Sequence, residues 1–192
     1  MARTIFGTAS LARSHESGPI RINLAGRILR LEWSHSGLTA DYIAEAVSAR
    51  FKGSKQVHNT VRHEIGFLAN ELIENAIKFG SGESIGVEAS VEHDTFRISV
   101  TNIASAALMP KLLTLLTELS SGEPQAMLLE QLEANALESE PNASGLGLLT
   151  LLADYGARMA WQIEDLPGEI STKISTHAAI TVPNHEAQHH GS

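Results

Sequence analysis

The stretch from His63 to Phe79 constrains the fold of this chain most, because its apolar residues repeat with the period of an α-helix. At 3.6 residues per turn, one face of such a helix is apolar and is formed by Ile65, Leu68, Ala69, Leu72, Ala76 and Phe79. Glu71, Asn75 and Lys78 follow the edge of that face, where polar side chains point into a cleft beside the core. We therefore predict a helix over about residues 57–79 that forms one wall of a binding site.

Asn75 needs a partner in this position, since a buried amide group left without a hydrogen bond costs about 1–3 kcal/mol. A magnesium ion carrying phosphate would satisfy the Asn75 side chain. The carbonyl group of a neighbouring loop would satisfy it equally well, with Glu71 simply in solvent. The helix alone leaves both interpretations open.

A second motif lies about 70 residues later, where glycines open another apolar segment: Ser144, Gly145, Leu146, Gly147 and Leu148. Glycines let a backbone approach a ligand closely, and the free N–H groups at a helix start attract phosphate. Ser144 is a good helix cap. A tight turn that leads into a helix has the same sequence pattern, so this motif indicates a phosphate site only in combination with the first motif.

Together, the two motifs resemble the GHKL family of ATP-binding domains, which includes gyrase, sensor histidine kinases and anti-sigma-factor kinases, over about residues 37–183. The resemblance implies that Asn75 holds Mg²⁺ on the ATP phosphates and that Glu71 is the general base, with Lys78 near the phosphates. It also implies that the phosphates are enclosed by residues of the second motif, namely Ser144, Gly145, Leu146, Gly147 and Leu148. A carboxylate one helical turn from a metal ligand has the right place to polarise a water or hydroxyl group.

One family element is altered in this sequence. The family carries Asp-x-Gly-x-Gly after a strand between the two motifs, and its Asp accepts a hydrogen bond from the adenine amino group. Here Asn102 stands in place of the Asp, and Ala104 and Ala106 stand in place of the glycines. An amide oxygen still accepts a hydrogen bond but brings no charge, and the methyl group of Ala104 lies where backbone should touch the ring. Asn102 and Ala104 are therefore the expected adenine contacts, in a weakened form.

The expected fold is α+β, a two-layer α/β sandwich of the Bergerat (GHKL) type, with a mixed, mostly antiparallel sheet and helices on one face. We predict a flexible arm over residues 1–18, a single domain over 19–183 and a disordered tail over 184–192. Within the domain, residue patterns predict strands at 20–24, 28–33, 85–92, 96–100, 158–164 and 170–182, with turns at His93-Asp94 and Pro167-Gly168. A further helix is expected from Thr39 to about Phe51.

An insert over residues 106–142 occupies the position of the family's ATP lid, yet its leucines predict two helices, joined near Pro124. The insert is rich in glutamate. A movable lid, a surface for docking a partner and a solvated helix pair that covers the core all remain open.

Charge and composition narrow the classes of partner and site. The net charge of −8, with no basic cluster, argues against nucleic acid. The absence of cysteine excludes disulfides and zinc–thiolate sites. The first twenty residues lack an apolar signal region and no segment has the length of a membrane span, so we expect a cytoplasmic protein that needs no membrane.

Two functions follow from these observations. The short bacterial proteins that share Trp33, Gly37, Leu38, Ala40 and Asp41 with this chain resemble anti-sigma-factor kinases of partner-switching systems. The first function is thus an ATP- and Mg²⁺-binding regulator, which would phosphorylate a regulatory protein with a STAS-like or response-regulator-like domain. The second is a degenerate module that sequesters a regulator without nucleotide chemistry. Oligomers are compatible with both.

Overall fold

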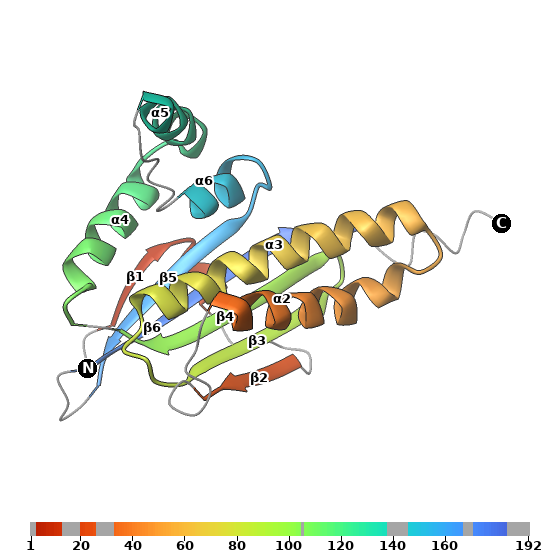
Figure 1. The fold of residues 1–192 in the computed structure, drawn as a ribbon, viewed down its shortest axis with the longest axis horizontal. Coiled ribbons are helices and arrows are strands. Elements are labelled where there is room, and N and C mark those ends of the chain that lie inside the picture. Colours follow the sequence, from red (N-terminus) through yellow and green to blue (C-terminus); the bar gives the residue numbers. More distant parts are fainter. Residues whose placement is uncertain are drawn as a thin grey trace.

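The computed structural model describes residues 3–12, 20–25, 33–104, 106–137, 146–166 and 171–183, and the statements below concern these residues. They form one six-stranded sheet with helices layered over one of its faces (Figure 1). The predicted fold class, an α+β two-layer sandwich, is confirmed.

The sheet has the strand order β1-β5-β6-β4-β3-β2, and all five strand pairs are antiparallel. The strands are β1 (Arg3–Gly7), β2 (Ile20–Leu24), β3 (Ile85–Glu92), β4 (Thr95–Ile103), β5 (Arg158–Asp165) and β6 (Thr172–Thr181). The predicted hairpin of β3 and β4 turns at His93 and Asp94, where His93 takes the left-handed conformation that a tight turn requires (φ 56°). Alternate residues of β4, such as Phe96 and Ile98, are fully buried under the helices.

The predicted long helix is confirmed as α3 (Lys55–Phe79), and it begins two residues earlier than expected. Ser54 caps it by accepting a hydrogen bond from the backbone N–H of Val57 (3.4 Å). The residues of its apolar stripe are buried along the whole length: Val61, Ile65, Leu68, Ala69, Leu72, Ile73, Ala76 and Phe79. This stripe fixes which side of α3 faces the sheet and therefore where Glu71 and Asn75 lie.

Helix α2 (Trp33–Ser48) continues into a 3₁₀ turn, η2 (Ala49–Phe51), and lies against α3. The prediction that Thr39 starts this helix was wrong. The Thr39 hydroxyl donates a hydrogen bond to the backbone carbonyl of His35, one turn earlier in the same helix (2.7 Å). Thr39 is therefore an interior residue of the helix and does not cap its start. The strand predicted over 28–33 is wrong at Trp33, which is the first residue of α2. Residues 28–32 lie outside the described part of the chain.

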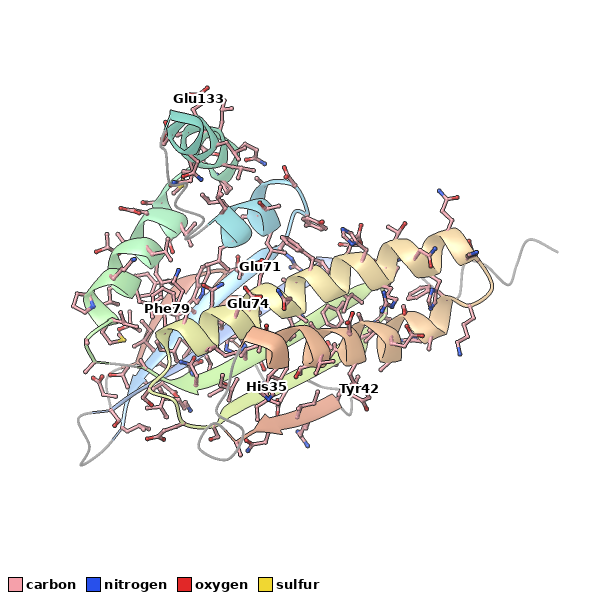
Figure 2. The ribbon with its side chains drawn as sticks, in the orientation of Figure 1. His35, Tyr42, Glu71, Glu74, Phe79 and Glu133 are labelled. Atoms are coloured by element: carbon pink, nitrogen blue, oxygen red, sulfur yellow. The ribbon has the colours of Figure 1, made fainter. Side chains whose placement is uncertain are left out.

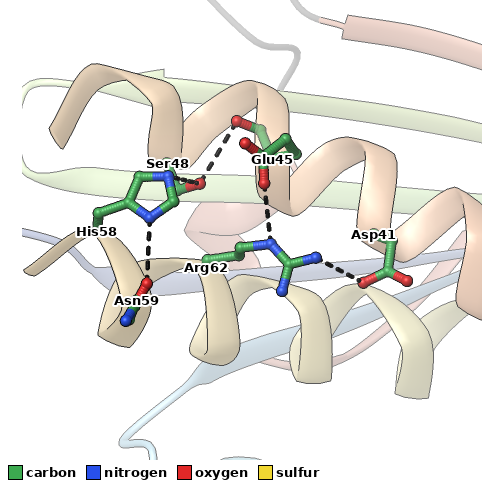
Figure 3. Close-up of polar contacts among 6 residues, drawn as sticks. All are labelled: Asp41, Glu45, Ser48, His58, Asn59 and Arg62. Carbon is green, nitrogen blue, oxygen red and sulfur yellow. Dashed lines mark hydrogen bonds and ion pairs between the residues drawn. The ribbon is translucent and has the colours of Figure 1, made fainter. Parts of the chain in front are cut away.

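Polar side chains connect the outer sides of α2 and α3 (Figure 3). Arg62 donates to Glu45 (2.9 Å) and lies 3.4 Å from Asp41. Ser48 lies 3.3 Å from Nε2 of His58. The side chains of Arg62, Asp41 and Glu45 are largely exposed, so their ion pairs add little stability.

The insert forms the two predicted helices, α4 (Met109–Ser121) and α5 (Pro124–Leu137), which precede α6 (Leu146–Ala153). Helix α4 buries Leu112, Leu116 and Leu119 in the main core. Helix α5 packs on α6 and lies far from the sheet (Figure 1).

The N-terminal segment differs from the predicted flexible arm over residues 1–18. Residues 3–7 form the edge strand β1, which pairs with β5 from Arg3↔Glu164 to Gly7↔Ala160. A 3₁₀ turn, η1 (Ala9–Leu11), follows and buries Leu11 against Ala160 and Ala179. The segment shows little apolar pattern because most of β1 is exposed, and its order comes from pairing with β5. The predicted turn at Pro167-Gly168 and the tail 184–192 lie outside the described residues.

Candidate functional site

The C-terminal half of α3 places Glu71 and Asn75 on its side that faces α6, and Figure 2 shows Glu71 between the two helices. The Asn75 amide donates a hydrogen bond to the backbone carbonyl of Glu71 (2.6 Å). Its N–H group is thus satisfied within the helix itself, a partner that neither of the expected interpretations named.

Glu71 lies directly against Gly147, in the first turn of α6. A Cβ atom at position 147 would overlap the carboxylate of Glu71. Glu71 of the first sequence motif and Gly147 of the second therefore lie next to each other. A side chain at position 147 would require the Glu71 carboxylate to move.

The space between the two motifs is almost filled. A void of about 20 Å³ remains there, lined by Leu72, Asn75, Ala76, Phe79, Asn102, Leu112, Leu148, Trp161, Ile174 and Thr176. A void of this size holds about one water molecule, whereas small-molecule pockets measure roughly 300–1,000 Å³. The donor chemistry fits a nucleotide with its metal, but an adenine ring does not fit in this void. Leu112, which α4 contributes, closes the void from the side of the insert.

Asn102 reaches this void from the end of β4, and its side chain is only 5% exposed. Its amide lies 3.4 Å from the carbonyl of Ile103. Ala104 is buried too, but it continues the sheet pattern by bridging to Gly80 and donating its N–H to Thr172, and it does not line the void. Of the two expected adenine contacts, the structure therefore brings Asn102 to the site and leaves Ala104 beside it.

Burial shifts the ionisation of two groups at this site. Burial raises the pKa of the Glu71 carboxyl, and the nearby Glu74 carboxylate raises it further, while Lys78 acts in the opposite direction. Burial also lowers the pKa of the Lys78 ammonium group, with a further lowering by Lys111. The Lys78 ammonium lies over the ring of Phe79, 5.5 Å from its centroid, and outside the lining of the void. A raised pKa makes the Glu71 carboxylate a stronger base, which keeps Glu71 a candidate general base.

The second motif is only partly covered by the structure. Ser144 and Gly145 lie outside the described residues, so their predicted roles as cap and phosphate clasp stay predictions. Leu146 is the first residue of α6, and Leu148 lines the void. Among the described residues, no group of three or more His, Asp or Glu side chains could hold a metal ion. A nucleotide-bound Mg²⁺ needs only one or two protein ligands, so the prediction for Asn75 does not depend on such a group.

The sequence analysis missed a larger pocket on the other side of Asn102. It measures about 520 Å³ and is lined by Ala76, Ile77, Gly80, Ser81, Gly82, Glu83, Ser84, Ile85, Asn102 and Ile103. The sequence analysis ended the long helix at about residue 79 and gave no functional role to the residues that follow it. The signal for a pocket was the run of small residues 80–82, whose short side chains leave the space open.

Comparisons with known proteins support the fold. No protein-family model matches this chain, and no curated protein matches it either. A chain in the crystal structure of the SiaB-SiaC complex from Pseudomonas aeruginosa is similar in structure, with a TM-score of 0.55 and 16% sequence identity. The similarity covers 84% of this chain and 89% of that chain. At this identity it establishes a shared fold.

The described helices also bear on membrane association. None of them combines the length and the apolar character that crossing a bilayer requires.

Proposed function

We propose that this chain is a regulatory protein of the partner-switching kind, which acts by binding another protein. One observation carries the choice over a nucleotide-dependent enzyme: the motif site is assembled, but the protein's own side chains close it. Glu71 lies on Gly147, and Leu112 and Trp161 line a void of only about 20 Å³ beside Asn75.

Two further observations support a protein partner. The similar solved structure is a complex of two proteins, SiaB and SiaC. The GHKL resemblance implies relatives of the anti-sigma-factor kinase type, whose partners are regulatory proteins. A STAS-like or response-regulator-like protein is therefore the class of partner we propose.

A second candidate is an ATP- and Mg²⁺-dependent protein serine/threonine kinase. The contact of Glu71 with Gly147 and the shared lining by Asn75, Asn102 and Leu148 favour it, because the motifs of the resemblance meet at one place. Asn75 would supply the metal ligand and Glu71 the general base. No nucleotide fits the void while Leu112 lines it, so this candidate needs either a movement of Leu112 or an adenine ring bound in the pocket of about 520 Å³ on the other side of Asn102.

Isothermal titration calorimetry separates the two candidates. ATP is titrated with and without Mg²⁺ into the wild type, Asn75→Ala and a matched control, Asn70→Ala. Asn70 lies on the same helix but donates to Glu74 (2.8 Å) and does not line the void. The proposed function predicts no binding heat at millimolar nucleotide for all three folded proteins.

The opposite result is equally well defined. Binding with a Kd between about 1 μM and 1 mM, roughly −8 to −4 kcal/mol, would favour the kinase if Asn75→Ala removed its Mg²⁺ dependence and Asn70→Ala kept it. Transfer of labelled phosphate from ATP to a co-purified protein would then establish the kinase over the module.

A further inference from the structure

The negative charge of this chain is concentrated in one segment. Between positions 112 and 157 there are seven of its 22 acidic residues and none of its 14 lysines and arginines: Glu118, Glu123, Glu130, Glu133, Glu138, Glu140 and Asp154. The segment also contains no histidine. Residues 112–157 therefore carry a net charge of −7 out of the −8 of the whole chain.

Helix α5 presents two of these carboxylates together with apolar side chains. Leu129 and Leu132 are one turn apart and are 58% and 50% exposed. Glu130 and Glu133, next to them in sequence, are exposed as well. Figure 2 shows Glu133 at the outer end of the insert, far from the sheet and from Glu71. Two exposed leucines beside carboxylates without a positive partner form an apolar surface whose contact with water is unfavourable.

The charge distribution points to one kind of occupant. A second copy would bring the same carboxylates against this face, and nucleic acid or an anionic membrane would bring phosphates, so each of these is repelled. A protein surface that carries lysine or arginine around apolar residues is attracted to the charge and buries the leucines. We propose that the outer face of α5, defined by Leu129, Glu130, Leu132 and Glu133, is the docking site for such a basic protein surface. This inference rests on the proposed protein-binding function and names the surface used for it.

The other exposed apolar pair of the described chain lacks this charge signature. Leu38 and Tyr42 on α2 are 72% and 60% exposed. Beside them, Arg62 pairs with both Asp41 and Glu45, so part of the negative charge of that surface is neutralised (Figure 3). Leu38 and Tyr42 are thus matched control positions: similarly apolar and exposed, but on a different surface.

Site-directed cross-linking tests the inference on the whole protein. The chain has no cysteine, so Leu129→Cys and the control Tyr42→Cys each carry one unique thiol for a benzophenone maleimide. Irradiation in extract from the native cells is expected to give a protein adduct from position 129 and none from position 42. Mass spectrometry identifies the adduct, and the protein found is then purified and titrated.

The titration has stated outcomes. Leu129→Ser with Leu132→Ser, or Glu130→Lys with Glu133→Lys, is expected to weaken binding of the purified partner about tenfold or more, and added salt should weaken the wild type. Leu38→Ser with Tyr42→Ser should change binding less than about twofold, and circular dichroism should show all variants folded.

Failure of the inference differs from failure of the proposed function. A wild type that binds its partner, with α5 variants that bind equally well, would overturn the α5 site and leave the function standing. Dimers of the wild type that dissociate in the α5 variants would show that a second copy occupies the face. A wild type that captures no saturable protein partner would overturn the proposed function together with the docking site.

Discussion

The motif site between α3 and α6 and the outer face of α5 are opposite kinds of surface. The motif site gathers Glu71, Asn75 and Asn102, the side chains best suited to binding a nucleotide and its metal. Packing leaves a void of only about 20 Å³ beside Asn75 and Asn102. The α5 face has no special chemistry, yet its leucines and glutamates stay in solvent. The difference shows that a motif indicates where a site can be built, while burial and charge decide whether a partner can reach it.

Leu112 gives the largest test of this contrast, because it is buried in the core and closes the void. Leu112→Ala is expected to lower the free energy of unfolding by about 2–4 kcal/mol, through lost apolar burial and a larger cavity. Chemical denaturation measures this loss. The neighbouring Leu113, 38% exposed, is the control, and Leu113→Ala should cost less than about 1 kcal/mol. Equal losses for both variants would mean that the insert does not close the site as described.

Gly147 tests the contact between the two motifs. Gly147→Ala places a methyl group on the Glu71 carboxylate and is expected to destabilise the protein by about 1–3 kcal/mol. Removing the carboxylate in Glu71→Ala should make the second substitution nearly neutral, so a double-mutant cycle should show strong coupling. Additive losses in that cycle would place Glu71 away from α6.

Substitution of Glu71 is expected to change the free energy of unfolding least, by an amount that depends on pH. Its pKa is raised in the folded protein, mainly by burial, so the folded state holds this proton more tightly than the unfolded state does. Stability from this group is therefore present below the ordinary glutamate pKa of 4.5 and is lost as the pH rises through the higher folded pKa. Glu71→Gln should be more stable than the wild type at pH 7 by less than about 1 kcal/mol, a small gain because the group is partly solvated. Thermal melts between pH 4 and 7 should show the gain shrinking as the pH falls, and a gain that grows instead would refute the raised pKa.

Several elements followed from local pattern. The apolar period of 65–79 predicted α3, the alternation in 85–100 predicted the β3–β4 hairpin, and the leucine spacing of the insert predicted α4 and α5. These segments have a clear period because each buries one face. The meeting of Glu71 with Gly147 was predicted from the family resemblance rather than from any local pattern.

Other elements depended on partners that no local pattern contains. β1 is mostly exposed and is ordered by its pairing with β5, so its residues had looked like an arm. Thr39 is a residue type that commonly caps helices, but the helix already begins at Trp33. The pocket beside Asn102 arises where the loop after α3 meets the end of β4, which are brought together only by the sheet.

The sequence by itself determined α3, the β3–β4 hairpin and the two helices of the insert, the two-layer sandwich that their apolar faces make, and the seven unbalanced carboxylates between positions 112 and 157. Those properties depend on local periodicity and on composition, which can be read without coordinates. Only the tertiary structure decided that Glu71 rests on Gly147, that Leu112 fills the space beside Asn75, and that Leu129 and Leu132 stay exposed. These outcomes depend on the volumes of side chains that meet from distant parts of the chain.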